Sequence, residues 1–230
     1  MGGSVTDFLI KLVNYGEKTF DYKGEQVAFF QKKQIKDIDD CCLNAITEVY
    51  DFDACKELFS KIHKLKSPKS CDALKIMIDR ETIDFIEIKG LKKFIADLKE
   101  ESEQKNKEKI EQKLVKFQIE TKIMDSIYLL YSVMNRGDFS LSTDQKNCFF
   151  KDVQKNYIIV VDFDMNDPRQ LIAASLGKSM AKSIALEGFM LEMLKEKLDD
   201  VPIDSVSHPK KSLIKTCSTI DKFYADVKIP

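Results

Sequence analysis

The sequence has few of the features that characterise zinc-binding proteins and disulfide-rich secreted proteins. Its 230 residues include only two histidines, and none of its six cysteines forms a CxxC pair. A zinc site built from CxxC pairs and a secreted disulfide framework are therefore both unexpected. We expect free thiols, buried or half-buried in a reducing cytosol, at every cysteine, namely Cys41, Cys42, Cys55, Cys71, Cys148 and Cys217.

The chain also has no marked excess of one charge and no long apolar run. Lysine and arginine number 37 and the acidic residues 38, for a net charge of −1. Without a global positive field, any contact with nucleic acid must come from local lysine clusters. No apolar run approaches the roughly 20 residues that span a bilayer. We expect a soluble, cytoplasmic protein without a membrane partner.

The length fits a single domain over 1–230, with a helical N-terminal region at about 1–66 and C-terminal helices at about 167–230. Apolar spacing predicts N-terminal helices at 5–15, 35–49 and 53–67. The segment 25–31 is the best candidate for a first core strand.

The rest of the chain alternates strands and helices. A hairpin at 72–79 and 82–89 precedes a helical stretch at 91–134, and the apolar run at 157–163 suits a strand buried on both faces. Asp167-Pro168 begins a helix that extends to about 198, a linker covers 202–209, and a short helix covers 212–224. This order predicts an α/β fold with a central mixed β-sheet flanked by helices.

The hairpin gathers ionisable side chains. Because side chains alternate along a strand, Asp72 shares one face with Leu74, while Glu87 and Lys89 share one face of the second strand. A two-residue turn at Arg80-Glu81 would place Asp72 opposite Lys89 and Leu74 opposite Glu87. All three ionisable groups then lie on the same face, whereas a three-residue turn would separate them.

An ordinary ion pair at a strand end would explain this arrangement. A bound cation would explain it equally, because neighbouring carboxylates repel each other. The residue types alone leave both readings open.

The spacing resembles that of the PD-(D/E)xK nuclease superfamily. Asp72 is followed by fourteen residues and then by Glu87-Ile88-Lys89, after an apolar run and before Gly90. In that family the Asp opens one strand, E-x-K lies on its hairpin partner, and a helix and another apolar strand follow. Cys71 stands where the motif has Pro. The resemblance covers about 67–90 and implies a restriction-endonuclease-like core with additional helices.

The resemblance implies a metal-dependent phosphodiesterase centre. Asp72, Glu87 and the Ile88 carbonyl would bind Mg²⁺ or Mn²⁺. The metal would lower the pKa of a bound water and neutralise charge in the transition state. Lys89 would orient or deprotonate the attacking water, or hold a phosphate oxygen.

Further residues are candidates for supporting roles. Family members often recruit an acid from a preceding helix, for which Glu48 and Glu57 are candidates, although each is also a plausible solvent-facing residue. Nearby lysines could contact a phosphate backbone or simply form solvated surfaces; these are Lys66, Lys69, Lys92 and Lys93.

We therefore expect a Mg²⁺-dependent nuclease that favours DNA over RNA, in a class where homodimers are common. The alternative is a catalytically silent module of the same fold that binds nucleic acid or protein. A weaker signal, Asp162-Phe163-Asp164 after an apolar run, has the look of haloacid dehalogenase-type phosphatases. We expect these aspartates simply to end a strand and begin a turn.

Overall fold

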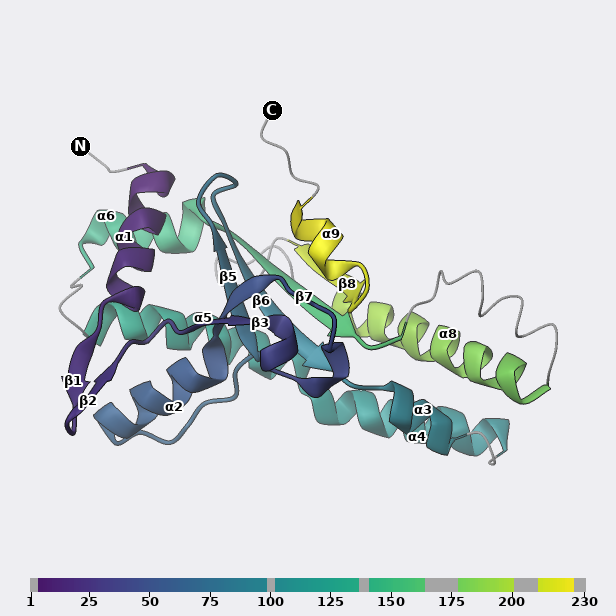
Figure 1. Cartoon of the computed structure of the whole chain (residues 1–230). Helices are drawn as coiled ribbons and strands as arrows, with labels where there is room; N and C mark the ends of the chain where they lie inside the picture. The colour runs from purple at the N-terminus through teal and green to yellow at the C-terminus, as the bar shows by residue number, and fades with distance from the viewer. Residues whose placement is uncertain (1–3, 99–101, 137–140, 164–177, 201–210, 226–230) are drawn as a thin grey trace.

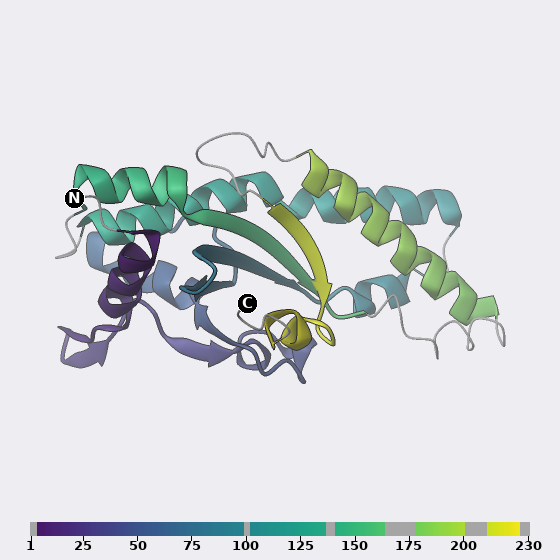
Figure 2. The same cartoon turned by 90° about the horizontal axis from the view of Figure 1, so that it is seen from above.

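A six-stranded mixed β-sheet with helices on both faces forms the centre of the computed structural model (Figures 1 and 2). The structure describes residues 4–98, 102–136, 141–163, 178–200 and 211–225. Among these, no helix is both long and apolar enough to cross a membrane. The predicted α/β class with a mixed sheet is confirmed.

The sheet changes from antiparallel to parallel at its centre. The pairs from β3 to β6 are antiparallel, and β6–β7 and β7–β8 are parallel. The carboxyl ends of β6, β7 and β8 therefore meet at one edge. In spatial order the strands are β3 (Lys32–Gln34), β4 (Glu48–Asp51), β5 (Ala73–Met77), β6 (Thr82–Lys89), β7 (Gln154–Val161) and β8 (Lys211–Thr216).

Parallel neighbours require long crossover connections, and helices supply them here. The chain between β7 and β8 contains α8 (Lys178–Asp199). The longer connection between β6 and β7 contains α3 (Lys92–Asp97), α4 (Glu103–Phe117), α5 (Ile119–Arg136), α6 (Thr143–Asn147) and the π-helical turn η3 (Cys148–Asp152).

The N-terminal part adds smaller elements around the sheet. Ser4 caps α1 through a capping box with Asp7, and Asp51 caps α2 by accepting a hydrogen bond from the Ala54 N–H. These elements are α1 (Val5–Glu17), the ribbon β1 (Phe20–Tyr22) and β2 (Glu25–Val27), the 3₁₀ turns η1 (Ile35–Asp37) and η2 (Asp40–Cys42), and α2 (Phe52–His63); α9 (Ile220–Ala225) ends the described chain.

Two hydrophobic cores lie on the two faces of the sheet. Phe85 and Tyr157 belong to the larger core, which α1, α2, α5 and α8 complete. Ile86 and Ile158 belong to the smaller core, which the η1–η2 segment and α9 cover. Consecutive residues of β6 and β7 thus face opposite cores, which is why both strands are buried at nearly every position and carry apolar residues on both faces.

In the N-terminal half one helix prediction was wrong, and one predicted strand belongs to a different sheet from the one expected. The predicted helix at 35–49 is replaced by η1, η2 and β4. The Asp39 side chain accepts from the Cys41 N–H and favours a turn there, while pairing with β3 and β5 recruits the β-prone end of the segment. Within the segment 25–31, residues 25–27 do form a strand, but it is β2 of the separate ribbon, so the first strand of the main sheet is β3.

Other boundaries also differ from the sequence-based expectation. The helix predicted at 53–67 begins at Phe52 and ends at His63, where Lys64 adopts a left-handed conformation with φ of 51°. The segment 212–224 divides into β8 and α9, because pairing with β7 extends its first half. The predicted helix start at Asp167-Pro168 and the linker at 202–209 lie outside the described residues.

The predicted hairpin register was wrong by two residues. Leu74 pairs with Phe85 and Met77 pairs with Thr82, so four residues, 78–81, connect the strands. Glu81 takes the left-handed conformation that this turn needs, with φ of 54°. A shift by two preserves the alternation of faces, and continuing the register brings Asp72 opposite Glu87 instead of Lys89.

The expectation of free thiols throughout was also wrong. Cys42 and Cys217 form a disulfide with a Cα–Cα separation of 5.1 Å across 175 residues of sequence. The fold brings η2 beside the end of β8, and no local spacing in the sequence indicates that proximity.

Candidate active site

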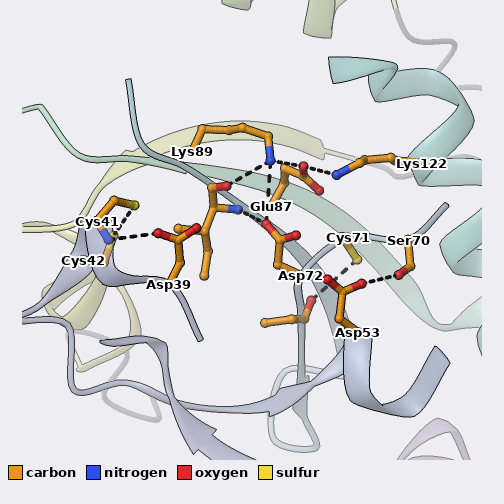
Figure 3. A network of polar contacts seen from close by, with 12 residues as sticks. Asp39, Cys41, Cys42, Asp53, Ser70, Cys71, Asp72, Glu87, Lys89 and Lys122 are labelled. Carbon is orange, nitrogen blue, oxygen red and sulfur yellow. Dashed lines mark hydrogen bonds and ion pairs between the residues drawn. The ribbon is translucent and has the colours of Figure 1, made fainter. Parts of the chain in front are cut away.

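Asp72 lies immediately before β5, where two backbone contacts hold it. Its Oδ2 accepts a hydrogen bond of 2.6 Å from the Ile88 N–H on β6. Its carbonyl accepts one of 3.0 Å from the Phe52 N–H at the start of α2. The carboxylate therefore projects toward the end of β6, as Figure 3 shows.

Glu87 is the most buried acid of this group, with its side chain only 2% exposed. Its Oε1 forms ion pairs with the ammonium groups of Lys89 and Lys122. Its Oε2 is buried and has no hydrogen-bond partner among the described residues, as is also true of the neighbouring Tyr157 hydroxyl. An unpartnered buried carboxylate oxygen has unused capacity to bind a cation or a donor.

Three oxygens surround the Lys89 ammonium. Nζ donates to the Ile88 carbonyl at 3.0 Å, lies 3.8 Å from Asp72 Oδ2, and pairs with Glu87 Oε1. These contacts converge in Figure 3. The oxygens come from the three residues that the sequence predicts as metal ligands, and the structure brings them around a single cation.

Lys122 is a site residue that the sequence analysis missed. It comes from α5, more than thirty residues after Glu87, and lies one helical turn before Ser126. Ser126 Oγ accepts a hydrogen bond of 2.9 Å from the Cys71 N–H, which fixes the helix against the start of β5. The sequence does offer one indication of this role, since Lys122 flanks the apolar residues by which α5 faces the core.

Burial dominates the electrostatics of the two acids. It raises the pKa of Asp72, against the opposing effect of Lys89. It also raises the pKa of Glu87, and the neighbouring Asp72 charge raises it further. Burial would lower the pKa of Lys122, but the charge and hydrogen bond of Glu87 outweigh it and the pKa is raised. The site thus favours cations beside its carboxylates.

Asp53 is the acidic residue of a preceding helix that lies near the site. It occupies the first turn of α2, and its Oδ1 accepts a hydrogen bond of 3.0 Å from Ser70 Oγ. Its charge contributes to the raised pKa of Asp72. Figure 3 shows Asp53 and Asp72 in the same network.

The two acids named from the sequence lie elsewhere. Glu48 is exposed at the far end of β4, three residues along the strand from Asp51. Glu57 is exposed on α2 and pairs with Lys61 at 3.5 Å. Asp53, in the first turn of the helix that carries Glu57, is the acid whose charge reaches Asp72 instead.

The candidate lysines are all on the surface. Lys66 and Lys69 are exposed in the loop before β5, and Lys92 and Lys93 are exposed at the start of α3. The Lys69 N–H donates to Asp125 of α5 at 3.0 Å, which ties this loop to the helix that carries Lys122. Both lysine clusters thus border elements that contribute side chains to the site.

Asp162 follows β7 and caps α3. Its Oδ1 accepts hydrogen bonds from the N–H groups of Leu91, at 2.8 Å, and Lys92, at 3.0 Å. It ends a strand, as expected, and Asp164 lies outside the described residues.

The donor set fits a hard divalent cation. Asp72, Glu87 and the Ile88 carbonyl supply oxygen atoms, which Mg²⁺ and Mn²⁺ prefer, and Glu87 Oε2 is unsatisfied. No protein-family model, curated protein or solved structure matches the chain, so the chemistry of the site must be inferred from its own geometry.

Proposed function

We propose that the protein is a Mg²⁺- or Mn²⁺-dependent nuclease with a restriction-endonuclease-like core, for which DNA is the favoured substrate. The observation that carries this proposal is the convergence of Asp72, Glu87 and the Ile88 carbonyl on one cation, the Lys89 ammonium. An oxygen cluster that already surrounds a positive charge can hold a metal ion once that lysine turns aside.

Each residue has a physically reasonable role in phosphodiester hydrolysis. Asp72, Glu87 and the Ile88 carbonyl would hold the metal, which supplies an activated water and offsets charge on the phosphate. Lys89 would orient the attacking water, help deprotonate it, or hold a phosphate oxygen. Lys122 pairs with Glu87 and would keep that buried carboxylate ionised.

The order of elements supports the same proposal. The β5–β6 hairpin, the following helices and the parallel strand β7 agree with the order expected for the PD-(D/E)xK family. Asp72 at the opening of one strand and Glu87-Ile88-Lys89 at the end of its partner agree with the placement of that motif. Cys71 in place of the motif's Pro is the one departure within it.

Exposed lysines on two sides of the site provide contacts for a nucleic-acid backbone. Lys66 and Lys69 lie before β5, and Lys92 and Lys93 follow β6. Phosphate contacts of this kind position a substrate without reading its sequence. A homodimer would let two such sites act on both strands of a duplex.

A catalytically silent module of the same fold is the second candidate. Two lysines already neutralise the carboxylates within the site, Lys89 beside Asp72 and Glu87 and Lys122 beside Glu87, and such a cluster can exist without metal. The module would bind nucleic acid through the exposed lysines and cleave nothing.

Cleavage of labelled DNA and RNA separates the two candidates. The protein is incubated with single- and double-stranded substrates in Mg²⁺ or Mn²⁺, beside the Glu87→Gln and Lys89→Ala variants. Glu57→Gln is the matched control, because it makes the same change at an exposed position on α2. We expect cleavage by the wild type and the control, with losses of about 100-fold or more in the other two.

Metal binding gives a second measurement. Titration calorimetry with Mn²⁺ should show a site that Glu87→Gln weakens and Glu57→Gln preserves. Binding of nucleic acid without cleavage, together with no Mn²⁺ site, would establish the silent module instead.

A further inference from the structure

Three cysteines from two distant segments meet at the carboxyl edge of the sheet. Cys41 and Cys42 lie in η2, and Cys217 follows β8. Their three Sγ atoms all lie within 4.8 Å of one another. This sulfur cluster, Cys41, Cys42 and Cys217, plays no part in the proposed phosphodiesterase chemistry.

The spacing suits a thiolate metal site. Tetrahedral zinc with Zn–S bonds of about 2.3 Å places its sulfur ligands about 3.8 Å apart. The Sγ atoms of Cys41 and Cys42 are 3.9 Å apart. Adjacent residues in an extended chain point their side chains to opposite sides, so it is the turn of η2 that brings both sulfurs to one side.

A pocket gives access to the sulfur cluster, and negatively charged side chains lie near it. A pocket of about 280 Å³ beside it is lined by Cys41, Cys217 and Asp162, among others. The Asp39 carboxylate accepts a hydrogen bond of 2.9 Å from the Cys41 N–H, and Asp162 lines the pocket, so negative groups lie on the approach to the sulfurs. Negative charge beside the sulfurs favours a divalent cation there.

In the structure two of the three sulfurs are joined as the Cys42–Cys217 disulfide, and Cys41 is a free thiol. Reduction adds two electrons and two protons to the disulfide and leaves three thiols. Zinc binding then releases the thiol protons. The disulfide and the metal site are alternative states of the same cluster.

We propose that in the reduced protein Cys41, Cys42 and Cys217 bind Zn²⁺ through three thiolates, with water from the adjacent pocket as the fourth ligand. The metal replaces the disulfide as the link between η2 and the end of β8. The link is structural, because these two segments cover the smaller hydrophobic core.

The zinc site is separate from the candidate active site but adjacent to it. Gly90 directly follows Lys89, and a Cβ built at Gly90 would lie 3.1 Å from Cys41 Cβ. Figure 3 shows Cys41 and Cys42 apart from Asp72 and Glu87, to their left. Thiolate ligands favour zinc, whereas carboxylate and carbonyl oxygens suit magnesium and manganese.

Cobalt substitution tests the proposal. The whole chain is reduced with a phosphine, which becomes the phosphine oxide by taking its oxygen from water, and is then titrated with Co²⁺ under nitrogen. We expect one equivalent of Co²⁺ to give sulfur-to-cobalt charge-transfer bands, and Zn²⁺ to abolish them by displacement. The same bands in Glu87→Gln would assign them to the cysteines, whatever the outcome at the carboxylates.

Two cysteine variants sharpen the test. Cys41→Ser removes one ligand and leaves the disulfide partners in place. Loss of a direct ligand should weaken Zn²⁺ binding by more than the roughly 10- to 100-fold that loss of an outer-shell partner costs. Cys148 is a buried thiol of η3 outside the cluster. The Cys148→Ser variant should therefore bind Zn²⁺ as the wild type does.

Absence of thiolate bands in the reduced wild type would overturn the proposal. So would Cys41→Ser with unchanged bands and affinity. If reduction abolishes the native circular dichroism and Zn²⁺ does not restore it, the cluster is a structural disulfide only, and the proposal is again overturned.

Discussion

The Asp72 carboxylate accepts a hydrogen bond of 2.6 Å from the Ile88 N–H, which joins the residue before β5 to the centre of the Glu87-Ile88-Lys89 triplet. Strand pairing between β5 and β6 reaches only to Ala73 and Ile86. The side chain of Asp72 thus continues the hairpin by one step, and this contact holds both acids on one face of the sheet.

Replacing Asp72 should reduce cleavage without reducing the stability of the fold. Asp72→Asn keeps an oxygen that can accept from the Ile88 N–H but removes the charge. We expect cleavage to fall by about 100-fold or more. Stability should be unchanged or increased, because burial disfavours the charged form. Parallel cleavage assays and thermal melting measure both effects, and a variant that melts well below the wild type would contradict the expectation.

Removing Lys122 should destabilise the protein through Glu87. Among the described residues, Lys122→Met leaves Lys89 as the one remaining ion-pair partner of the buried Glu87 carboxylate. We expect a loss of about 2 kcal/mol in the free energy of unfolding, less than for a fully buried pair because Lys122 is partly exposed. Urea denaturation measures it.

A double-mutant cycle controls for lost packing at this pair. Lys122→Met combined with Glu87→Gln should recover part of the loss, because no unpaired charge remains. Simple additivity of the two single changes would show that the ion pair is not the cause.

Asp84 should make stability depend on pH in the acidic range. Its Oδ1 accepts a hydrogen bond of 2.7 Å from Asn156, and its Oδ2 one of 3.0 Å from the Tyr224 hydroxyl. Burial raises the pKa of Asp84 above 3.8, although both hydrogen bonds oppose the shift. Below pH 3.8 the Asp84 carboxyl is protonated in both the folded and the unfolded state, so it does not lower the free energy of unfolding.

As the pH rises from 3.8 through the raised pKa of Asp84, the folded state holds a proton that the unfolded state has lost, so stability falls. Asp84→Asn cannot titrate. The free energy of unfolding of the wild type relative to this variant should therefore decrease over that range, as urea titrations at several pH values would show. A constant difference would contradict the assignment.

Asp221 should show the opposite dependence. Its carboxylate accepts hydrogen bonds from the N–H groups of Ile46, at 3.0 Å, and Thr47, at 2.7 Å, and from the Thr47 hydroxyl. Burial alone would raise the pKa of Asp221, but these hydrogen bonds outweigh it and the pKa is lowered. The carboxylate joins α9 to the segment before β4.

Asp221→Ala should cost about 2 kcal/mol of stability at neutral pH, the usual contribution of hydrogen bonds to a charged group. That contribution is present above pH 3.8 and is lost as the pH falls through the lowered pKa of Asp221. Wild type and variant should therefore converge in stability at low pH, which urea denaturation at several pH values measures. Exposed Asp144→Ala on α6 is the control.

The alternation of side chains along strands made part of the site predictable. Glu87 and Lys89 share a face because they are two residues apart, and Asp72 joins them because an even number of residues forms the turn. The two-residue error in register did not matter for the face, since only parity decides it. The apolar run in β7 was predictable for a similarly local reason.

Everything that joins distant segments was decided by tertiary structure. Helices and loops that pack against the sheet bring together residues that are far apart in the sequence. The examples are Lys122, Asp53 and the Cys42–Cys217 pair, whose partners lie from 19 to 175 residues away along the chain. The conversion of 35–49 and 212–216 to strands and turns has the same origin, because a strand gains its stability from the neighbours it pairs with.

The sequence by itself thus determined which ionisable residues of β6 share one face of the strand. Only the folded chain decided which partners surround them and how their charges are balanced. Local periodicity is a property of a few consecutive residues, whereas packing is a property of the whole chain.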